Sequence, residues 1–298
     1  MIGVGSALHR PILPYGPDRA VKTLDPVRRR ALIGVMAPTP VRREPPPFRR
    51  AEVRRLERRS PRLVRVTLGG AELEGFVVPD PAASVRLLLP SPGTTELVMP
   101  TWHGNEFLLP DGTRPVIRTL TPRSYDAGAR ELDLEIVVHG VGVASRWAAA
   151  AGPGAAAAVS GPGRGFTIDS EAGGFLLAGD ETAVPAISQL LEALPRQTPV
   201  EVHVEVAGPE ARVTLPAHPA STVTWHELAS GATPGDALVA AVRDAELASD
   251  ARAWVAGEAA AVQHIRHHLF EERGVERSRA AVRGYWKHGR SADPRDSG

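Results

Sequence analysis

Hydrophobic and polar residues alternate with a period of two along the first half of the chain, which is the pattern of strands with one buried face. Apolar runs of strand length recur between clusters of Gly, Pro and Asp, at residues 63–68, 85–89, 116–120 and 132–138. The arginine-rich stretch from Arg49 to Arg65 alternates in the same way beside Glu52 and Glu57, without interleaved aromatic residues. We interpret it as a charged exterior rather than a nucleic-acid surface. Residues 48–168 are therefore predicted to form an antiparallel all-β barrel.

The pattern changes from about residue 172 onward, where strand-length apolar runs alternate with segments of helical spacing. Strands are expected at residues 175–178, 200–206, 223–225 and 253–256. Apolar residues recur at helical spacing over residues 184–194, 234–245 and 262–269. This order is typical of an open parallel sheet with helices on its faces, so residues 172–290 are predicted to form an α/β domain. Ligands of such sheets bind outside the carboxyl ends of the strands.

Both ends of the chain differ from these two halves. Prolines are dense in residues 1–47, which we expect to form a loosely ordered extension, and residues 291–298 are expected to be a flexible tail. No stretch approaches the ~20 apolar residues of a membrane span. The first 47 residues also lack the charged start and apolar stretch of a secretory signal. We therefore expect a cytoplasmic protein.

Composition restricts the chemistry. The 298 residues include no cysteine, which excludes disulfides, thiolate metal sites, cysteine-ligated clusters and thiol catalysis. Any redox chemistry must therefore use a bound cofactor. The net charge of +1 gives no overall attraction to nucleic acid. His264, His267 and His268 share a predicted helix without nearby acidic or thiolate partners, so we expect a solvated helical face and no metal site.

Residues 132–147 are the most informative segment, because they indicate a strand that passes through a glycine elbow into a helix. The strand stops at His139-Gly140, and residues 142–145 lead into an alanine-rich helix through Trp147. Unpaired N–H groups and the positive end of the helix dipole converge beside the strand tip, which favours a phosphate. A strand-turn-helix connection without a ligand is the alternative interpretation of this segment alone.

Two further clusters lie at predicted strand ends. Arg118 and Thr121 end a strand of the barrel half, where a guanidinium can pair with a phosphate and a hydroxyl can bond a ring. In the α/β half, Asp180-Glu181-Thr182 and Glu258 follow predicted strands. These acidic residues have a second interpretation as helix caps.

In chain order these motifs resemble those of the siderophore-interacting protein family, the ferric-siderophore reductase branch of the ferredoxin-reductase-like flavoproteins. The resemblance runs from about residue 50 to residue 290. It rests on LGGAELEGF (68–76), HGVGVASRWA (139–148), GPGRGF (161–166), LLAGDETAVPAI (176–187), AWVAGE (253–258) and GYWKHG (284–289). It implies an antiparallel FAD-binding β-barrel followed by a parallel-sheet nucleotide-binding domain. The implied activity is reduction of Fe(III)-siderophore to Fe(II), which releases iron in the cytoplasm.

The resemblance also implies roles for residues. Arg118 resembles the arginine of the family's Arg-x-Tyr-Thr motif that approaches the FAD phosphate, and Thr121 resembles the residue that bonds the flavin ring. The implied FAD-binding residues are Arg118, Leu120, Thr121, Val138, His139, Gly140, Ala144, Ser145, Trp147, Asp180, Glu181 and Thr182. Electrons pass through the flavin, so no general acid or nucleophile is expected.

The chain departs from the family's pattern at two positions. Leu120 stands at the aromatic position of the motif, and it can cover the ring but lacks π-stacking, which is usually worth about 0.5–1.5 kcal/mol. Flavin affinity and potential are therefore expected to differ from the family norm. Val143 stands where many relatives have proline, which softens the entry to the helix without removing a backbone donor.

Basic residues are the implied holders of the ferric siderophore. They occupy three places, one on a barrel strand, one in the GPGRG turn and one around Tyr285-Trp286: Arg86; Arg164; and Arg279, Arg283 and Lys287. A flavin accepts two electrons from a nicotinamide and passes on one at a time. Reduction frees the metal, because the hard oxygen ligands of siderophores favour Fe(III).

The electron donor stays open among NADPH, NADH and a ferredoxin, since no Gly-x-Gly-x-x-Gly motif follows the strand at Phe175. Arg212 could meet the 2′-phosphate of NADPH, but we favour its interpretation as a solvated loop arginine. Two other functions also stay open. One is a general NAD(P)H:flavin or ferredoxin-type reductase with another acceptor, and the other is a non-catalytic siderophore- or flavin-binding protein. Neither a nucleic-acid nor a membrane partner is expected.

Overall fold

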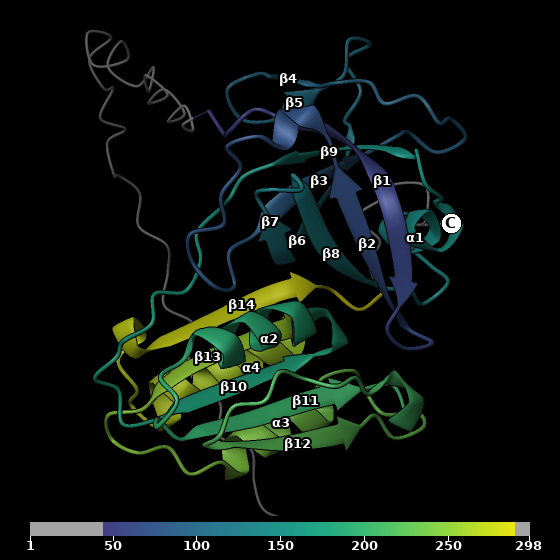
Figure 1. Ribbon diagram of the computed structural model, residues 1–298. Coiled ribbons are helices and arrows are strands. Elements are labelled where there is room, and N and C mark those ends of the chain that lie inside the picture. Colours follow the sequence, from purple (N-terminus) through teal and green to yellow (C-terminus); the bar gives the residue numbers. More distant parts are fainter. Residues whose placement is uncertain (1–43, 290–298) are drawn as a thin grey trace, which may run out of the picture. The chain divides into compact units, whose positions relative to one another are not determined.

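Seven antiparallel strands build the first half of the structure (Figure 1). They are β1 (Arg49–Arg58), β2 (Leu63–Gly69), β3 (Val85–Leu89), β6 (Val116–Leu120), β7 (Pro122–Asp126), β8 (Glu131–Val137) and β9 (Ala156–Ser160). The strands pair in the order β6-β3-β9-β1-β2-β8-β7, so the two edge strands are consecutive in sequence and are joined by Thr121 alone. A separate two-stranded sheet contains β4 (Thr101–Trp102) and β5 (Phe107–Leu108). The predicted barrel is therefore present as a half-barrel.

The computed structural model describes residues 44–289. Most of the predicted N-terminal extension, residues 1–43, and the whole predicted tail, residues 291–298, lie outside the described residues. No helix within residues 44–289 is long and apolar enough to cross a membrane.

Apolar side chains at alternating positions hold the half-barrel together. Leu68, Leu132 and Leu134 are fully buried in its core, and the pairing of β2 with β8 sets Leu68 opposite Leu132. On the other face of the same strand pair, Arg65 donates from Nη2 to Oε1 of Glu135 at 2.7 Å. The period-two pattern thus produces one apolar face and one face of cross-strand ion pairs.

Five parallel strands form the second half. They are β10 (Phe175–Asp180), β11 (Val200–Val206), β12 (Ser221–Glu227), β13 (Arg252–Glu258) and β14 (Ala280–Trp286), in the order β12-β11-β10-β13-β14. Helix α2 (Val184–Ala193) packs on one face, while α3 (Asp236–Asp244) and α4 (Ala259–His267) pack on the other (Figure 1). The chain leaves β10 for one edge and returns to β13, so the topological switch point lies between the carboxyl ends of these two strands.

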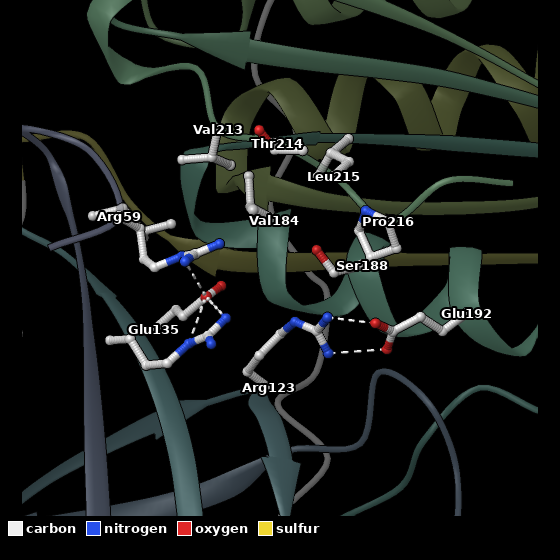
Figure 2. A pocket seen from close by; sticks show the side chains of 12 residues that line it. Arg59, Arg123, Glu135, Val184, Ser188, Glu192, Val213, Thr214, Leu215 and Pro216 are labelled. Atoms are coloured by element: carbon white, nitrogen blue, oxygen red, sulfur yellow. Dashed lines mark hydrogen bonds and ion pairs between the residues drawn. The ribbon is translucent and has the colours of Figure 1, made fainter. Parts of the chain in front are cut away.

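Ion pairs join the half-barrel to the parallel sheet. Arg123 on β7 donates to both carboxylate oxygens of Glu192 on α2, at 2.9 and 2.5 Å. Nε of Arg62 lies 2.9 Å from both carboxylate oxygens of Glu181, which follows β10. A cavity of about 300 Å³ lies at this junction, lined by half-barrel arginines, α2 and residues 213–216 (Figure 2).

Candidate functional site

The glycine elbow predicted after β8 is present, and it leads into α1 (Val143–Ala150). Gly140 and Gly142 have φ values of 80° and 78°, a conformation that suits glycine. Gly142 is the cap residue of α1, and within the described part of the chain no side chain caps this helix. A Cβ built on Gly140 would meet no atom within 4 Å. The elbow therefore offers open space beside uncapped helix amides, an arrangement that binds phosphate groups.

Ser145 fixes the shape of this elbow. Its side chain is buried, and its Oγ accepts a hydrogen bond from the backbone N–H of His139 at 2.9 Å. Val138, Ala144 and Trp147 are half-buried and pack against the core of the half-barrel. What Ser145 can offer a phosphate is therefore its main-chain N–H in the first turn of α1.

His139 lies beside the ion pair of Arg62 and Glu181. The backbone N–H of Val138 donates to the carbonyl oxygen of Arg62 at 2.6 Å, which brings the elbow next to this pair. Glu181 also accepts from the backbone N–H of Ala207 at 2.7 Å. Partial burial lowers the pKa of His139, the positive charge of Arg62 lowers it further, and Glu181 opposes both. The neutral form of the imidazole is therefore favoured.

Strand β6 ends at the second predicted cluster. Arg118 is half-buried and donates from Nη1 to the carbonyl oxygen of Ile117 at 2.9 Å. Leu120 is half-buried and packs partly against the half-barrel core. Thr121 is buried, and its hydroxyl lies 3.2 Å from the hydroxyl of Tyr285 on β14. Sequence reasoning assigned no role to Tyr285, whose one signal is its place in the GYWKHG segment.

Asp180 and its neighbours make contacts within the protein. The carboxylate of Asp180 accepts from the backbone N–H and the hydroxyl of Thr182, at 2.9 and 2.5 Å. It also accepts from Nε1 of Trp286 at 2.6 Å. Complete burial raises the pKa of this carboxyl group. The cap interpretation therefore describes Asp180, which caps the short turn at residues 181–183, while Thr182 donates to it and Glu181 is engaged by Arg62.

Two more buried carboxylates end neighbouring strands. Glu205 on β11 accepts from two amides at the start of α3, at 2.6 and 3.1 Å. Glu258 on β13 accepts from two amides at the start of α4, at 2.5 and 3.0 Å, and from the backbone N–H of His288 at 3.0 Å. Burial raises the pKa of Glu205. Burial alone would raise the pKa of Glu258 too, but its backbone hydrogen bonds outweigh that effect and lower it. The amides that a nucleotide phosphate would need are thus taken by side chains.

The basic residues fall into two groups. The side chains of Arg86, Arg164 and Lys287 have no hydrogen bond or ion pair to any other residue within 44–289. Arg86 is half-buried on β3, and the other two are exposed. Their charges therefore remain available to an anion.

Arg283 and Arg279 differ from these three. Arg283 donates only to main-chain carbonyls of the half-barrel segments within the described structure. Arg279 precedes β14 and donates to the carbonyl oxygen of Ala251 at 3.1 Å. The length of β14 separates it from Trp286 by roughly 20 Å. The structure thus does not bring Arg279 together with Trp286 and Lys287.

The residues expected to bind FAD fit that cofactor best at the elbow. The uncapped amides of α1 and the open space at Gly140 suit its diphosphate, and Arg118 adds a cation on β6. The cavity of Figure 2 is a different place, since it is lined by none of the residues expected to hold FAD. Over residues 44–289, no group of three His, Cys, Asp or Glu side chains could hold a metal ion.

An antiparallel half-barrel followed by a five-stranded parallel sheet is the ferredoxin-reductase-like fold. The model of the siderophore-interacting FAD-binding domain matches residues 52–166, and the model of the siderophore-interacting protein matches residues 172–289. The chain belongs to the siderophore-interacting protein family. The family and the fold predicted from the sequence are thereby confirmed.

Named relatives cover most of the chain. It is 32% identical to the ferric vibriobactin reductase of Vibrio cholerae, over 78% of this chain and 87% of that protein. It is 30% identical to the NADPH-dependent ferric-chelate reductase of Escherichia coli, over 80% of this chain and 92% of that protein. The crystal structure of a siderophore utilization protein from T. fusca is 38% identical, with a TM-score of 0.75 over 84% of this chain and 97% of that chain.

Proposed function

We propose that the protein uses FAD to reduce Fe(III) in a siderophore complex, so that Fe(II) is released in the cytoplasm. The observation that carries this proposal is the uncapped elbow at α1, an anion site on the FAD-binding half of a chain that has no cysteine. The reductases of V. cholerae and E. coli, which act on ferric complexes by name, support it. When bound, FAD supplies an acceptor for two electrons that can pass them on singly.

We assign the FAD to residues 48–168 and the electron donor to residues 172–290. The amides of Val143, Ala144 and Ser145 would hold the diphosphate, with Arg118 beside it. Thr121 would meet the flavin ring, with Tyr285 fixing the orientation of its hydroxyl. This assignment relies on the amides at the start of α1, which no side chain in the described structure caps, and on Arg118 and Thr121 at the edge of the half-barrel.

The proposed substrate is an anionic ferric complex. Arg86, Arg164 and Lys287 support this class, because their charges are not neutralised by carboxylates within the described structure. The donor is proposed to be NADPH or NADH, as the name of the E. coli relative suggests, with a ferredoxin as the alternative. The carboxylates that cap α3 and α4 occupy amides that could otherwise hold a dinucleotide phosphate, and the ferredoxin is kept as the alternative for this reason.

The deciding experiment follows the colour of the protein reconstituted with FAD. We expect NADPH, NADH or a reduced ferredoxin to bleach the flavin absorption, and Fe(III) tris(catecholate) or the anionic Fe(III) complex of a hexadentate catecholate siderophore to restore it. Fe(II) trapped by ferrozine should appear in step with reoxidation. A protein that stays colourless with FAD would contradict the proposal and favour a binding function. Faster turnover of soluble dyes than of both ferric complexes would favour a general flavin reductase.

A charge-neutralised variant tests the proposed binding site for the ferric siderophore. We expect Arg86→Gln/Arg164→Gln to raise the KM for Fe(III) tris(catecholate) at least about tenfold, because each charge-assisted hydrogen bond contributes about 1.5–3 kcal/mol. FAD content should stay unchanged. Arg196→Gln is the control, since Arg196 is exposed and also has no partner in residues 44–289. Equal KM values for the parent protein, the double variant and the control would contradict the assignment of Arg86 and Arg164 to the ferric-siderophore site.

A further inference from the structure

Arg283 joins β14 to two segments of the half-barrel through main-chain carbonyls. Its Nη1 donates to the carbonyl oxygens of Ala82 at 3.3 Å and Arg164 at 3.2 Å, and its Nη2 donates to that of Gly165 at 2.8 Å. No carboxylate within residues 44–289 forms an ion pair with it. Both hydrogens of Nη1 are thus used in hydrogen bonds inside the protein. A guanidinium that binds a substrate directly would instead keep these donors exposed.

The two segments that Arg283 holds lie against each other. The backbone N–H of Gly163 donates to the carbonyl oxygen of Ser84 at 2.6 Å, and that of Phe166 donates to Pro81 at 2.8 Å. A Cβ on Gly165 would lie 2.3 Å from the Cβ of Asp80, so residues 80–84 and 163–166 are closely packed. A shift of one segment therefore shifts the other.

Ala82 shows that this contact is tightly specified. It is completely buried and has a φ of 54°, which is uncommon for a residue other than glycine. Its N–H donates to Oε1 of Gln189 on α2 at 2.8 Å, while its carbonyl accepts from Arg283. The parallel-sheet half thus holds both polar groups of one left-handed residue, and such residues persist where the surroundings fix them.

The three unpartnered basic residues all belong to the segments that meet at Arg283. Arg86 follows residues 80–84 directly on β3, Arg164 lies in the second segment, and Lys287 follows β14 four residues after Arg283. Backbone hydrogen bonds hold the first two segments to each other, and the Arg283 guanidinium ties β14, which leads to Lys287, to both of them. A planar fork with five donors can bridge three carbonyls, whereas an ammonium group is a point charge without that geometry.

We propose that Arg283 is a positioning residue for the ferric-siderophore site, which sets Arg86, Arg164 and Lys287 relative to one another rather than attracting the substrate by its own charge. This inference rests on the proposed function, since it concerns the same site. It replaces the direct substrate contact expected from the sequence with an indirect role.

Substitution by lysine separates the two roles, because it keeps the charge and removes the three-carbonyl bridge. The dissociation constant of Fe(III) tris(catecholate), measured by quenching of tryptophan fluorescence, should rise about fivefold in Arg283→Lys and in Arg283→Met. FAD content, and the reduction rate of an uncharged quinone, should stay within about twofold of the parent protein. The control is Arg266→Met, which removes an arginine that donates to the carbonyl of Val282 on the same strand without touching the half-barrel.

A combined variant tests whether the effect passes through the basic residues. In the Arg86→Gln/Arg164→Gln background, Arg283→Lys should change the dissociation constant by less than about twofold, because two of the three charges that Arg283 is proposed to position are already absent. Arg283→Lys that binds like the parent protein would overturn the inference, as would loss of FAD from this variant or an equal effect of Arg266→Met. If the parent protein binds the ferric complex but does not reduce it, the proposed function fails while the binding result still decides the role of Arg283.

Discussion

Leu120 is the residue at which this chain differs most consequentially from its family's pattern. It is half-buried at the edge of the half-barrel, next to Thr121, and packs partly against the half-barrel core. We predict that Leu120→Tyr lowers the dissociation constant for FAD about twofold to tenfold, since aromatic stacking adds about 0.5–1.5 kcal/mol. Flavin fluorescence during titration of the apoprotein measures this. Thr119→Tyr is the matched control, because Thr119 is exposed and points to the opposite face of β6. Equal affinities for the two variants would contradict the role of Leu120.

His139 provides a second test at the scale of single residues. Arg62 lowers the pKa of His139 and Glu181 raises it, so Arg62→Met removes the first effect and leaves the second without its partner. We predict that the pKa of His139 rises toward its ordinary value in this variant. NMR titration of the imidazole in the FAD-free protein measures it, with His139→Asn to assign the signal. An unchanged or lower pKa would place the ion pair too far away to act.

The same shift fixes how His139 affects stability. Its folded-state pKa lies below the unfolded value, so protonation favours the unfolded chain. The stabilising contribution is fully present above the unfolded pKa of about 6.5 and is lost as the pH falls through the folded pKa. In Arg62→Met the folded-state pKa of His139 should lie closer to the unfolded value. The loss of stability should therefore occur over a narrower pH range. The protonation of His139 thus links the electrostatics of its surroundings to the pH dependence of the free energy of unfolding.

Helix caps are the main feature at the scale of elements. Asp180, Glu205 and Glu258 end adjacent strands, and each accepts hydrogen bonds from the amides of the helix or turn that begins there. Helix starts at this edge of a parallel sheet are where nucleotide phosphates bind. In this chain, carboxylates occupy that position instead, so the edge is less suited to an anion.

We predict that Glu205→Gln lowers the KM for NADPH by roughly threefold to tenfold, because it removes one charge from the edge that a dinucleotide must approach. Some loss of stability is expected as well, since the amide group cannot accept both hydrogen bonds. Steady-state kinetics with Fe(III) tris(catecholate) measure the change. Glu192→Gln, an exposed carboxylate on α2, is the control. An unchanged KM would show that no nucleotide docks at this edge, which would favour a ferredoxin as the donor.

The elements themselves could largely be predicted, for physical reasons that also explain the omissions. Strands β2, β8 and β11 carry strong apolar patterns, and the sequence places them to within about a residue. By contrast, β7 reads PRSYD and β9 reads AAAVS, and neither composition distinguishes a strand from a turn or a helix. Strand β14 has one well-buried position, Val282, and its other side chains are half-buried or exposed. Local patterns predict strands that carry large apolar side chains, and they miss strands of small or polar residues, whether these pair at an edge, as β7 does, or inside the sheet, as β9 does.

At the scale of the whole described unit, the order of the motifs identifies the family, but the contacts between the halves could not be predicted. The elbow after β8 follows from local glycines and was predicted with its helix. The contact of Thr121 with Tyr285, and the bridging role of Arg283, join residues more than 100 positions apart. Such contacts depend on how two sheets pack, and one sequence carries no signal for that. Because arginine is abundant in the chain, the basic residues expected to bind the siderophore could not be ranked from the sequence. Their hydrogen-bond partners in the structure distinguish them.

The two ion pairs between the halves should differ in their contribution to stability. Glu181 is buried and accepts from Arg62 and from the backbone of Ala207, whereas Glu192 is about half exposed in its pair with Arg123. Removing the charge of Glu192 should change the free energy of unfolding by less than about 1 kcal/mol, because solvent screens an exposed pair. Removing that of Glu181 should cost about 1.5–3 kcal/mol, because its donors lose a charged acceptor in a buried place.

Urea unfolding of Glu181→Gln and Glu192→Gln in the FAD-free protein measures this difference. The two substitutions are chemically identical, so each serves as the control for the other, and burial is the main physical difference between them. Because Glu181 also lies beside His139, its loss should weaken FAD binding as well, whereas Glu192→Gln should bind FAD like the parent protein. Equal unfolding free energies would mean that the junction is held by apolar packing along α2 and not by its buried carboxylate. In that case the position of the elbow would be set by strand β8, and the ion pair of Glu181 would not contribute to it.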